Sequence, residues 1–69
     1  MHVLRESAAG AEVALSREEL LLLNNALNEV CNGVHLAEGE FATRLGVERG
    51  EALSLLSAVN HLVDRIISN

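Results

Sequence analysis

Three side chains near the C-terminus have the types that serve in nucleophilic catalysis. Ser57, His61 and Asp64 follow one another at intervals of four and three residues, which places them on one face of a helix. Their groups could act as nucleophile, base and orienting carboxylate. A straight helix supplies no oxyanion hole, no pocket and nothing that excludes water. We therefore interpret the trio as the solvated face of an amphipathic helix, and we expect the protein not to be an enzyme.

The cysteine and the histidines offer a second possible chemistry, metal binding. Cys31 and His35 straddle Gly33, whereas His2 and His61 are far away in the sequence. A zinc site needs about four ligands at recognisable spacing. One cysteine and three dispersed histidines do not meet that requirement. We predict no metal and no cofactor, and we interpret Cys31 as a small core residue.

The size of the chain limits how well it can stabilise itself. Its 69 residues make one small domain, and a chain of this length buries only about 60% of its unfolded surface. The single cysteine cannot form a disulfide within the chain. We therefore expect support from a second copy or from a partner.

The charge balance excludes some partners. The net charge is −5, and all five basic residues are arginine. Such a chain is repelled by phosphate and by anionic lipid and attracted to basic proteins. The start, MHVLRES, lacks the apolar stretch of a secretion signal, and the longest apolar run, Leu20–Leu23, is far below the ~20 residues of a membrane span. We expect no membrane contact and a cytoplasmic location, and the composition is typical of a GC-rich bacterial genome.

The sequence predicts a mainly α fold: a compact three-helix domain with a short N-terminal β-hairpin or arm. Residues 1–15 lack helical periodicity and favour two strands around a turn containing Gly10, with an irregular alanine-rich arm as the alternative. Residues 16–69 form the three-helix domain. Its helices are expected from the capping box of Ser16 and Glu19 to about residue 32, with Gly33 as a left-handed stop, and then over 38–45 and 49–67.

Helical spacing divides the first helix into two stripes. The predicted core stripe is Leu20, Leu23, Leu27, Val30 and Cys31. The neighbouring flank is Leu21, Asn24, Asn25, Asn28 and Asn32, which we call the amide strip. Asparagine is a poor helix former, so an ordinary exposed flank would favour Glu, Lys or Arg. We interpret the strip as a contact surface without the desolvation cost of charge. The alternative is that these amides cap the loop at 33–37 or the ends of neighbouring helices.

The third helix has an apolar arc of about half its circumference. The predicted core positions are Ala52, Leu55, Leu56, Val59, Leu62, Val63 and Ile66, and Leu53 lies outside them. An arc this wide exceeds what one packing face needs. We predict a homodimer whose contacts come from Leu21, Asn25, Asn28, Leu53, Leu56 and Ile67.

Residues 40–56, EFATRLGVERGEALSLL, resemble the helix-turn-helix signature of bacterial DNA-binding proteins. Ala42 and Gly46 have the spacing of that motif, and its apolar positions are filled by Phe41, Leu45, Val47, Ala52 and Leu55. The resemblance implies a helical corner, with a transcriptional regulator as the alternative function. The positions that would read DNA are Glu48, Arg49, Gly50, Glu51, Leu53, Ser54 and Ser57. Carboxylates there would face phosphates, so we expect no DNA binding.

The stretches SREELLLLNNALNEVCNG and FATRLGV are also similar to a family of small, uncharacterised bacterial proteins, which implies no activity. The most concentrated negative patch around the short helix is Glu38, Glu40, Glu48 and Glu51. We therefore expect a non-catalytic, acidic protein–protein interaction module. One concrete version is an immunity- or antitoxin-like inhibitor that masks a basic partner, and the wider set of contact residues then adds Asn24 to those of the homodimer.

Overall fold

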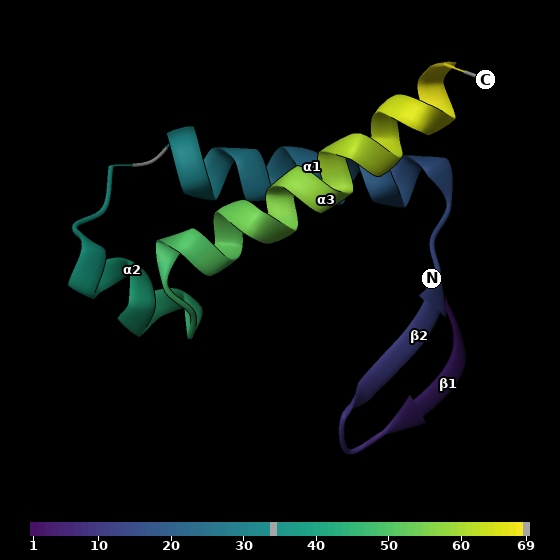
Figure 1. The fold of residues 1–69 in the computed structure, drawn as a ribbon, viewed down its shortest axis with the longest axis horizontal. Coiled ribbons are helices and arrows are strands. Elements are labelled where there is room, and N and C mark those ends of the chain that lie inside the picture. The colour runs from purple at the N-terminus through teal and green to yellow at the C-terminus, as the bar shows by residue number, and fades with distance from the viewer. Residues whose placement is uncertain (34, 69) are drawn as a thin grey trace.

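The computed structural model describes residues 1–33 and 35–68, and the fold is mainly α as predicted (Figure 1). A two-stranded antiparallel hairpin is followed by three helices and one π-helical turn. The elements are β1 (His2–Ser7), β2 (Gly10–Ala14), α1 (Arg17–Asn28), the π-helical turn η1 (Glu29–Gly33), α2 (Glu38–Leu45) and α3 (Arg49–Ser68).

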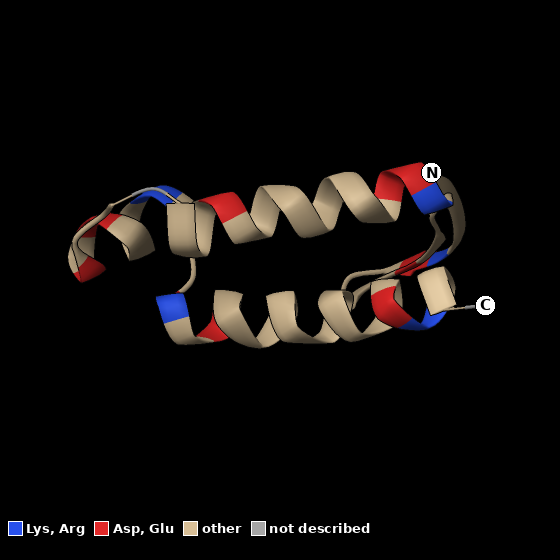
Figure 2. Cartoon of the chain, turned by 90° about the horizontal axis from the view of Figure 1, so that it is seen from above, with Lys and Arg blue, Asp and Glu red and all other residues tan. Residues whose placement is uncertain are grey.

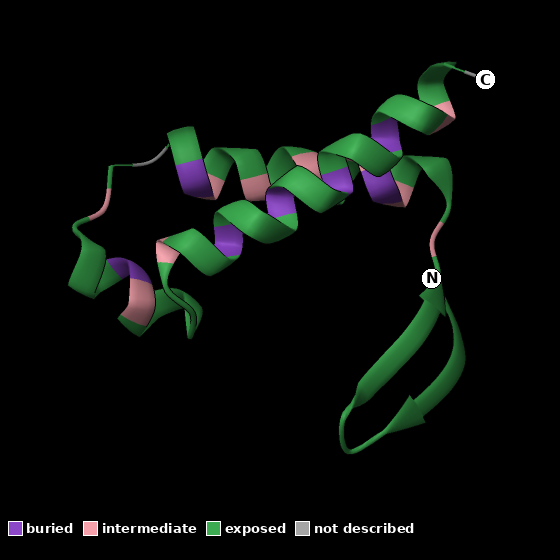
Figure 3. Ribbon diagram, viewed as in Figure 1, coloured by how far each residue is buried: buried purple, intermediate pink, exposed green. Residues whose placement is uncertain are grey.

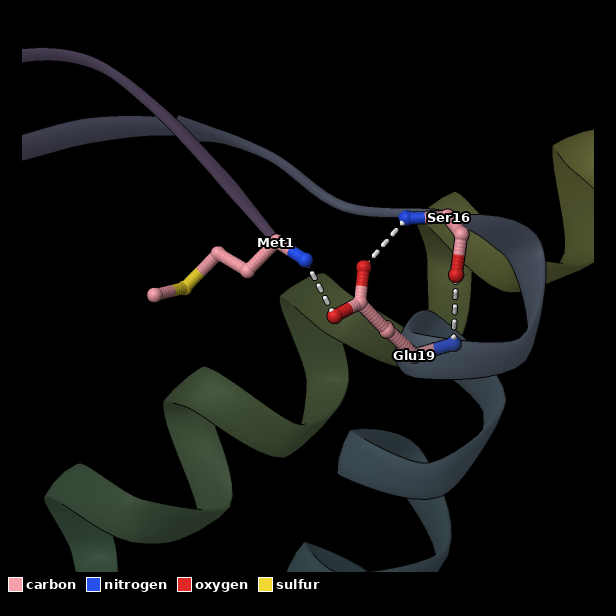
Figure 4. A network of polar contacts seen from close by, with 3 residues as sticks. All are labelled: Met1, Ser16 and Glu19. Atoms are coloured by element: carbon pink, nitrogen blue, oxygen red, sulfur yellow. Dashed lines mark hydrogen bonds and ion pairs between the residues drawn. The ribbon is translucent and has the colours of Figure 1, made fainter.

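The predicted capping box at the start of α1 is confirmed. The Ser16 hydroxyl accepts from the Glu19 amide at 3.1 Å, and the Glu19 carboxylate accepts from the Ser16 amide at 2.9 Å. The other Glu19 oxygen accepts from the Met1 ammonium group (Figure 4). The ammonium group first, and the Ser16 amide next, hold the pKa of Glu19 below its ordinary value. One carboxylate thus caps a helix and ties the chain terminus to it.

The end of α1 differs from the prediction. The α-helix ends at Asn28 rather than near residue 32, and a π-helical turn continues to Gly33. The φ angle of Gly33 is not positive, so Gly33 is not a left-handed stop. A π turn holds more residues per turn, and here both Val30 and Cys31 pack in the cluster around Phe41. A sequence period of 3.6 cannot reveal such a change of winding.

The core lies between α1 and α3, which run antiparallel side by side (Figures 1 and 2). Figure 3 shows the buried positions on the sides of the helices that face one another. One cluster of buried side chains is Cys31, Phe41, Ala52 and Leu56, and the other is Leu20, Val59 and Val63. Phe41, the single aromatic residue, is fully buried and fastens α2 to the pair.

The predicted corner between α2 and α3 is also present. Gly46 has φ 78°, and its amide donates to the Ala42 carbonyl at 2.8 Å. This left-handed residue ends α2 and lets the chain reverse into α3. The corner places the C-terminal end of α2 beside the N-terminal half of α3.

The hairpin extends away from the helices (Figure 1). Val3 pairs with Val13, and the register shifts at a bulge between Val3 and Arg5. Every residue of both strands is exposed, and among the described residues the strands contact no helix. The turn is formed by residues 8 and 9, and Gly10 already belongs to β2, opposite Ser7. The hairpin prediction is therefore confirmed, but its side chains do not contribute to the core.

Candidate functional site

An open apolar groove of about 410 Å³ runs along one side of the α1–α3 pair. Three segments line it with aliphatic side chains and a single carboxylate. They contribute Leu23, Ala26, Leu27 and Val30 from α1, Leu45 and Val47 from the end of α2 and the following turn, and Glu51, Ala52 and Leu55 from α3. We call this surface the apolar groove. A mostly apolar lining with few polar groups is typical of binding sites.

Sequence reasoning missed this groove because it assigned several lining residues to the core. Leu23 and Leu55 lie on the predicted core stripes, yet Leu55 is 53% exposed and Leu23 is exposed as well. Leu62, also predicted as core, is exposed on α3. The helical period finds the apolar arc correctly. It cannot show that α1 and α3 bury only the centre of that arc against each other.

The apolar positions of the helix-turn-helix resemblance are likewise only partly buried. Of its apolar positions, Phe41 and Ala52 are buried, whereas Leu45, Val47 and Leu55 are exposed along the groove. The corner itself is formed, but the described part of the chain supplies nothing that covers it. The exposed apolar residues of this segment, Leu45, Val47 and Leu55, are therefore a candidate contact surface.

Arg49, at the start of α3, is engaged inside the molecule. Its guanidinium donates to the carbonyls of Cys31 at 2.8 Å and Leu36 at 2.7 Å, and to the Glu38 carboxylate at 2.8 Å. It also lies 4.5 Å from the ring centroid of Phe41. Arg49 is only 21% exposed, so the one cation on the would-be DNA-reading face is not available to a phosphate.

The acidic patch around α2 is only partly available. Glu38 forms its ion pair with Arg49, and Glu40 pairs with Arg44 at 2.8 Å. Glu48 and Glu51 form no ion pair with any described residue. Glu48 lies directly before α3. Glu51 lies in the first turn of α3 and lines the groove. Of the four carboxylates of this patch, only Glu48 and Glu51 are therefore open to a basic partner.

The amide strip is partly satisfied within the chain. The Asn32 amide group donates to the Asn28 side-chain oxygen at 3.0 Å. Asn60 of α3 lies 3.5 Å from the side-chain oxygen of Asn24 and so links the two long helices. Asn25 is exposed. These contacts are neither loop caps nor helix caps, and the interpretation of the strip as a contact surface stays a prediction.

The apolar members of the predicted dimer surface lie in different environments. Leu53 is 40% exposed, and Ile67 is exposed near the end of α3. Leu21 is half-buried against the cluster of Leu20, Val59 and Val63. Leu56 requires a correction: it is 9% exposed because it packs against Phe41 and Ala52, so it serves the core and is not free for a partner.

The trio of Ser57, His61 and Asp64 remains on one exposed face of α3. The Nδ1 atom of His61 lies 2.8 Å from the Ser57 carbonyl oxygen, one turn earlier, and no hydrogen bond joins the imidazole to the Ser57 hydroxyl. The described residues also contain no group of three side chains placed to hold a metal. Cys31 is buried, as the sequence predicts.

None of the described helices is both long and apolar enough to cross a membrane. Comparison of the chain with family models, with curated proteins and with solved structures finds no match. The geometry of the groove and the distribution of charge are therefore the features of this molecule that bear on its function.

Proposed function

We propose that this chain is a non-catalytic protein–protein interaction module and that the apolar groove is its contact surface. The observation that carries the proposal is an open cavity of about 410 Å³ that is aliphatic apart from one carboxylate. Contiguous exposed apolar surface is costly in water and is typical of interaction sites. The exposed leucines of the groove come from all three helices, so a partner could bury them together.

The distribution of charge supports a protein partner. α1 carries no charged residue between Glu19 and Glu29, and α3 carries none between Glu51 and Asp64 (Figure 2). The charged residues gather at the helix ends, so the middle of the helical pair can be covered without desolvating an ion. Low charge in the centre with charge at the rim is the usual organisation of a protein interface.

The experiment is size-exclusion chromatography of the native lysate, with two matched variants. Leu55→Glu places a carboxylate in the groove, and Leu53→Glu places the same group two residues away on α3, outside the groove lining. We expect the wild-type protein and Leu53→Glu to elute in an assembly larger than one chain, and Leu55→Glu to elute as a monomer. A wild-type monomer, or an assembly that Leu55→Glu leaves intact, contradicts the proposal.

A finer version of this function is an immunity- or antitoxin-like inhibitor that masks a basic partner. It is supported by the net charge of −5 and by Glu51 in the lining of the groove. Rim charges steer a partner and make binding sensitive to salt. Rising salt should dissociate an assembly held by this field, and an assembly that resists salt argues against the basic partner.

A further inference from the structure

The molecule has more surface than a folded chain of its mass requires. Its accessible surface is 5120 Å², against about 4,200 Å² for a compact monomer of 7.4 kDa. The excess is about 900 Å², and one partner of a standard interface buries about 800 Å². The radius of gyration is 13.5 Å, compared with about 11 Å for a compact domain of this length. One interface of ordinary size would therefore remove the excess.

Two separate apolar surfaces contribute to this exposed area. One is the groove, and the other is the hairpin, where Val3, Leu4 and Val13 are all exposed. An isolated two-stranded hairpin is marginal in water and needs more strands or a helix to pack against. Within the described residues it has neither, because the strands pair only with each other. The hairpin thus lacks a helical surface to pack on, and the groove lacks a cover.

The two surfaces cannot satisfy each other within one chain. Figure 1 shows α2 and the hairpin extending from the same side of the α1–α3 pair, at its opposite ends. The groove opens on that side, since Leu45 and Val47 at the end of α2 line it. The hairpin is joined directly to the start of α1 through Leu15, which packs on the second core cluster. It therefore stays near the far end of the helical pair.

The hairpin carries little net charge. Arg5 lies opposite Glu12, and Glu6 is the second carboxylate, so residues 1–15 carry a formal charge of −1 and the helical part carries the remaining −4. Arg5 and Glu12 already form an ion pair at 3.5 Å on the hairpin. The hairpin therefore brings its apolar side chains to the groove with a net charge of only −1.

We propose that a second copy of this chain occupies the groove, and that the hairpin of each copy packs its apolar side chains into the groove of the other. The two contacts are related by a two-fold axis, so each copy gives one hairpin and receives one. This inference depends on the proposed function, because it names the partner of the same groove. It assigns the groove to self-association rather than to a different protein.

The test is light scattering of the purified protein at tens of micromolar, with circular dichroism to check that each variant folds. We expect the wild type to be a dimer. Leu55→Glu in the groove and Leu4→Arg on the hairpin should each give monomers. The matched controls, Leu53→Glu on α3 and Ala8→Arg in the hairpin turn, should remain dimers.

Mixing the two monomeric variants makes the test specific for exchange. The Leu55→Glu copy keeps an intact hairpin and the Leu4→Arg copy keeps an intact groove, while the two altered surfaces carry opposite charges. The mixture should therefore recover a mixed dimer. A mixture that stays monomeric overturns the proposed exchange of hairpins between copies. A dimer that only Leu53→Glu dissociates overturns it as well. A monomeric wild type overturns the proposal that a second copy occupies the groove. The chromatography of the lysate then shows separately whether the groove binds another protein.

Discussion

Arg49 connects the parts of the molecule that the core does not hold together. Its hydrogen bonds join the end of η1, the segment before α2 and the start of α3, through Cys31, Leu36 and Glu38. Because hydrogen bonds from a charged donor contribute roughly 1.5–3 kcal/mol each and are not additive, we expect Arg49→Ala to destabilise the fold by about 2 kcal/mol or more. Urea denaturation measures this loss.

Arg49→Lys is the informative control, because lysine keeps the charge but lacks the planar fork that reaches several acceptors at once. We expect the lysine variant to recover only a small part of the lost stability. Full recovery would mean that charge alone, and not the geometry of the guanidinium group, fixes the segment before α2.

Glu19 predicts a specific response to acid. Its pKa is lowered in the folded state by the Met1 ammonium group and the Ser16 amide. A lowered carboxyl pKa stabilises the fold above the ordinary value of 4.5, and this contribution is lost as the pH falls through the lower folded value. Between pH 6 and pH 3, the melting temperature of the wild type should therefore fall more than that of Glu19→Gln.

Glu18→Gln serves as the control for that comparison, since Glu18 adjoins Glu19 but forms no capping hydrogen bond among the described residues. Its melting temperature should follow that of the wild type. Equal acid responses of the wild type and Glu19→Gln would show that the Met1 and Ser16 contacts do not persist in solution.

Among the individual residues, only contacts between sequence neighbours could be predicted. Ser16 and Glu19 are three residues apart, and their types define the cap without any tertiary information. The partners of Arg49 are 11 to 18 residues away, and their positions depend on the π-helical turn and on the segment before α2. From the sequence alone, Arg49 is therefore only a possible phosphate contact.

At the scale of elements, the corner between α2 and α3 depends on one backbone conformation. Gly46 has φ 78° in open surroundings, so a methyl group there would meet no atom and would add only conformational strain. A non-glycine residue in the left-handed region costs roughly 1–2 kcal/mol. Gly46→Ala should therefore destabilise the fold by about 1 kcal/mol, measured by thermal denaturation.

Gly50→Ala is the matched control, because Gly50 lies in the first turn of α3 and its surroundings are also open. Alanine is favoured over glycine within a helix, so this variant should be as stable as the wild type or more stable. A loss of stability in Gly50→Ala equal to that in Gly46→Ala would contradict the role of the left-handed turn.

The boundaries of α2 and α3 and the apolar arc of each long helix could be predicted from spacing. Which part of each arc is buried could not be predicted, because burial depends on how many elements pack against the helix. Leu56 and Leu55 are neighbours in the sequence and both belong to the predicted core of α3. Only Leu56 reaches Phe41, while Leu55 lines the groove.

For the molecule as a whole, the charge distribution predicts the response to nucleic acid. The net charge is −5, Glu48 and Glu51 lie on the would-be reading face, and Arg49 is bound internally. A reading face whose one arginine is engaged internally gains little from the release of counterions around DNA. We expect no shift of DNA in gels at physiological salt. A sequence-specific complex of nanomolar affinity would favour the transcriptional regulator instead.

The direction of the hairpin is the feature of the whole molecule that could not be predicted. The turn and the strands follow from residues 2–14, but nothing in those residues fixes the angle at which they leave α1. The structure places them away from the helices, and this arrangement leaves every residue of both strands exposed (Figure 3). The groove stays open as well.

The central claim is that the apolar groove is the contact surface of the protein. Methyl NMR spectra of the purified wild type over a dilution series test it most directly, because they report the surroundings of each leucine and valine. We predict that the signals of Leu23, Val47 and Leu55 shift together with concentration, while those of Leu22, exposed at 70% outside the groove, stay constant. Groove signals that do not change, with shifts confined to Leu53 and Ile67, would contradict the account.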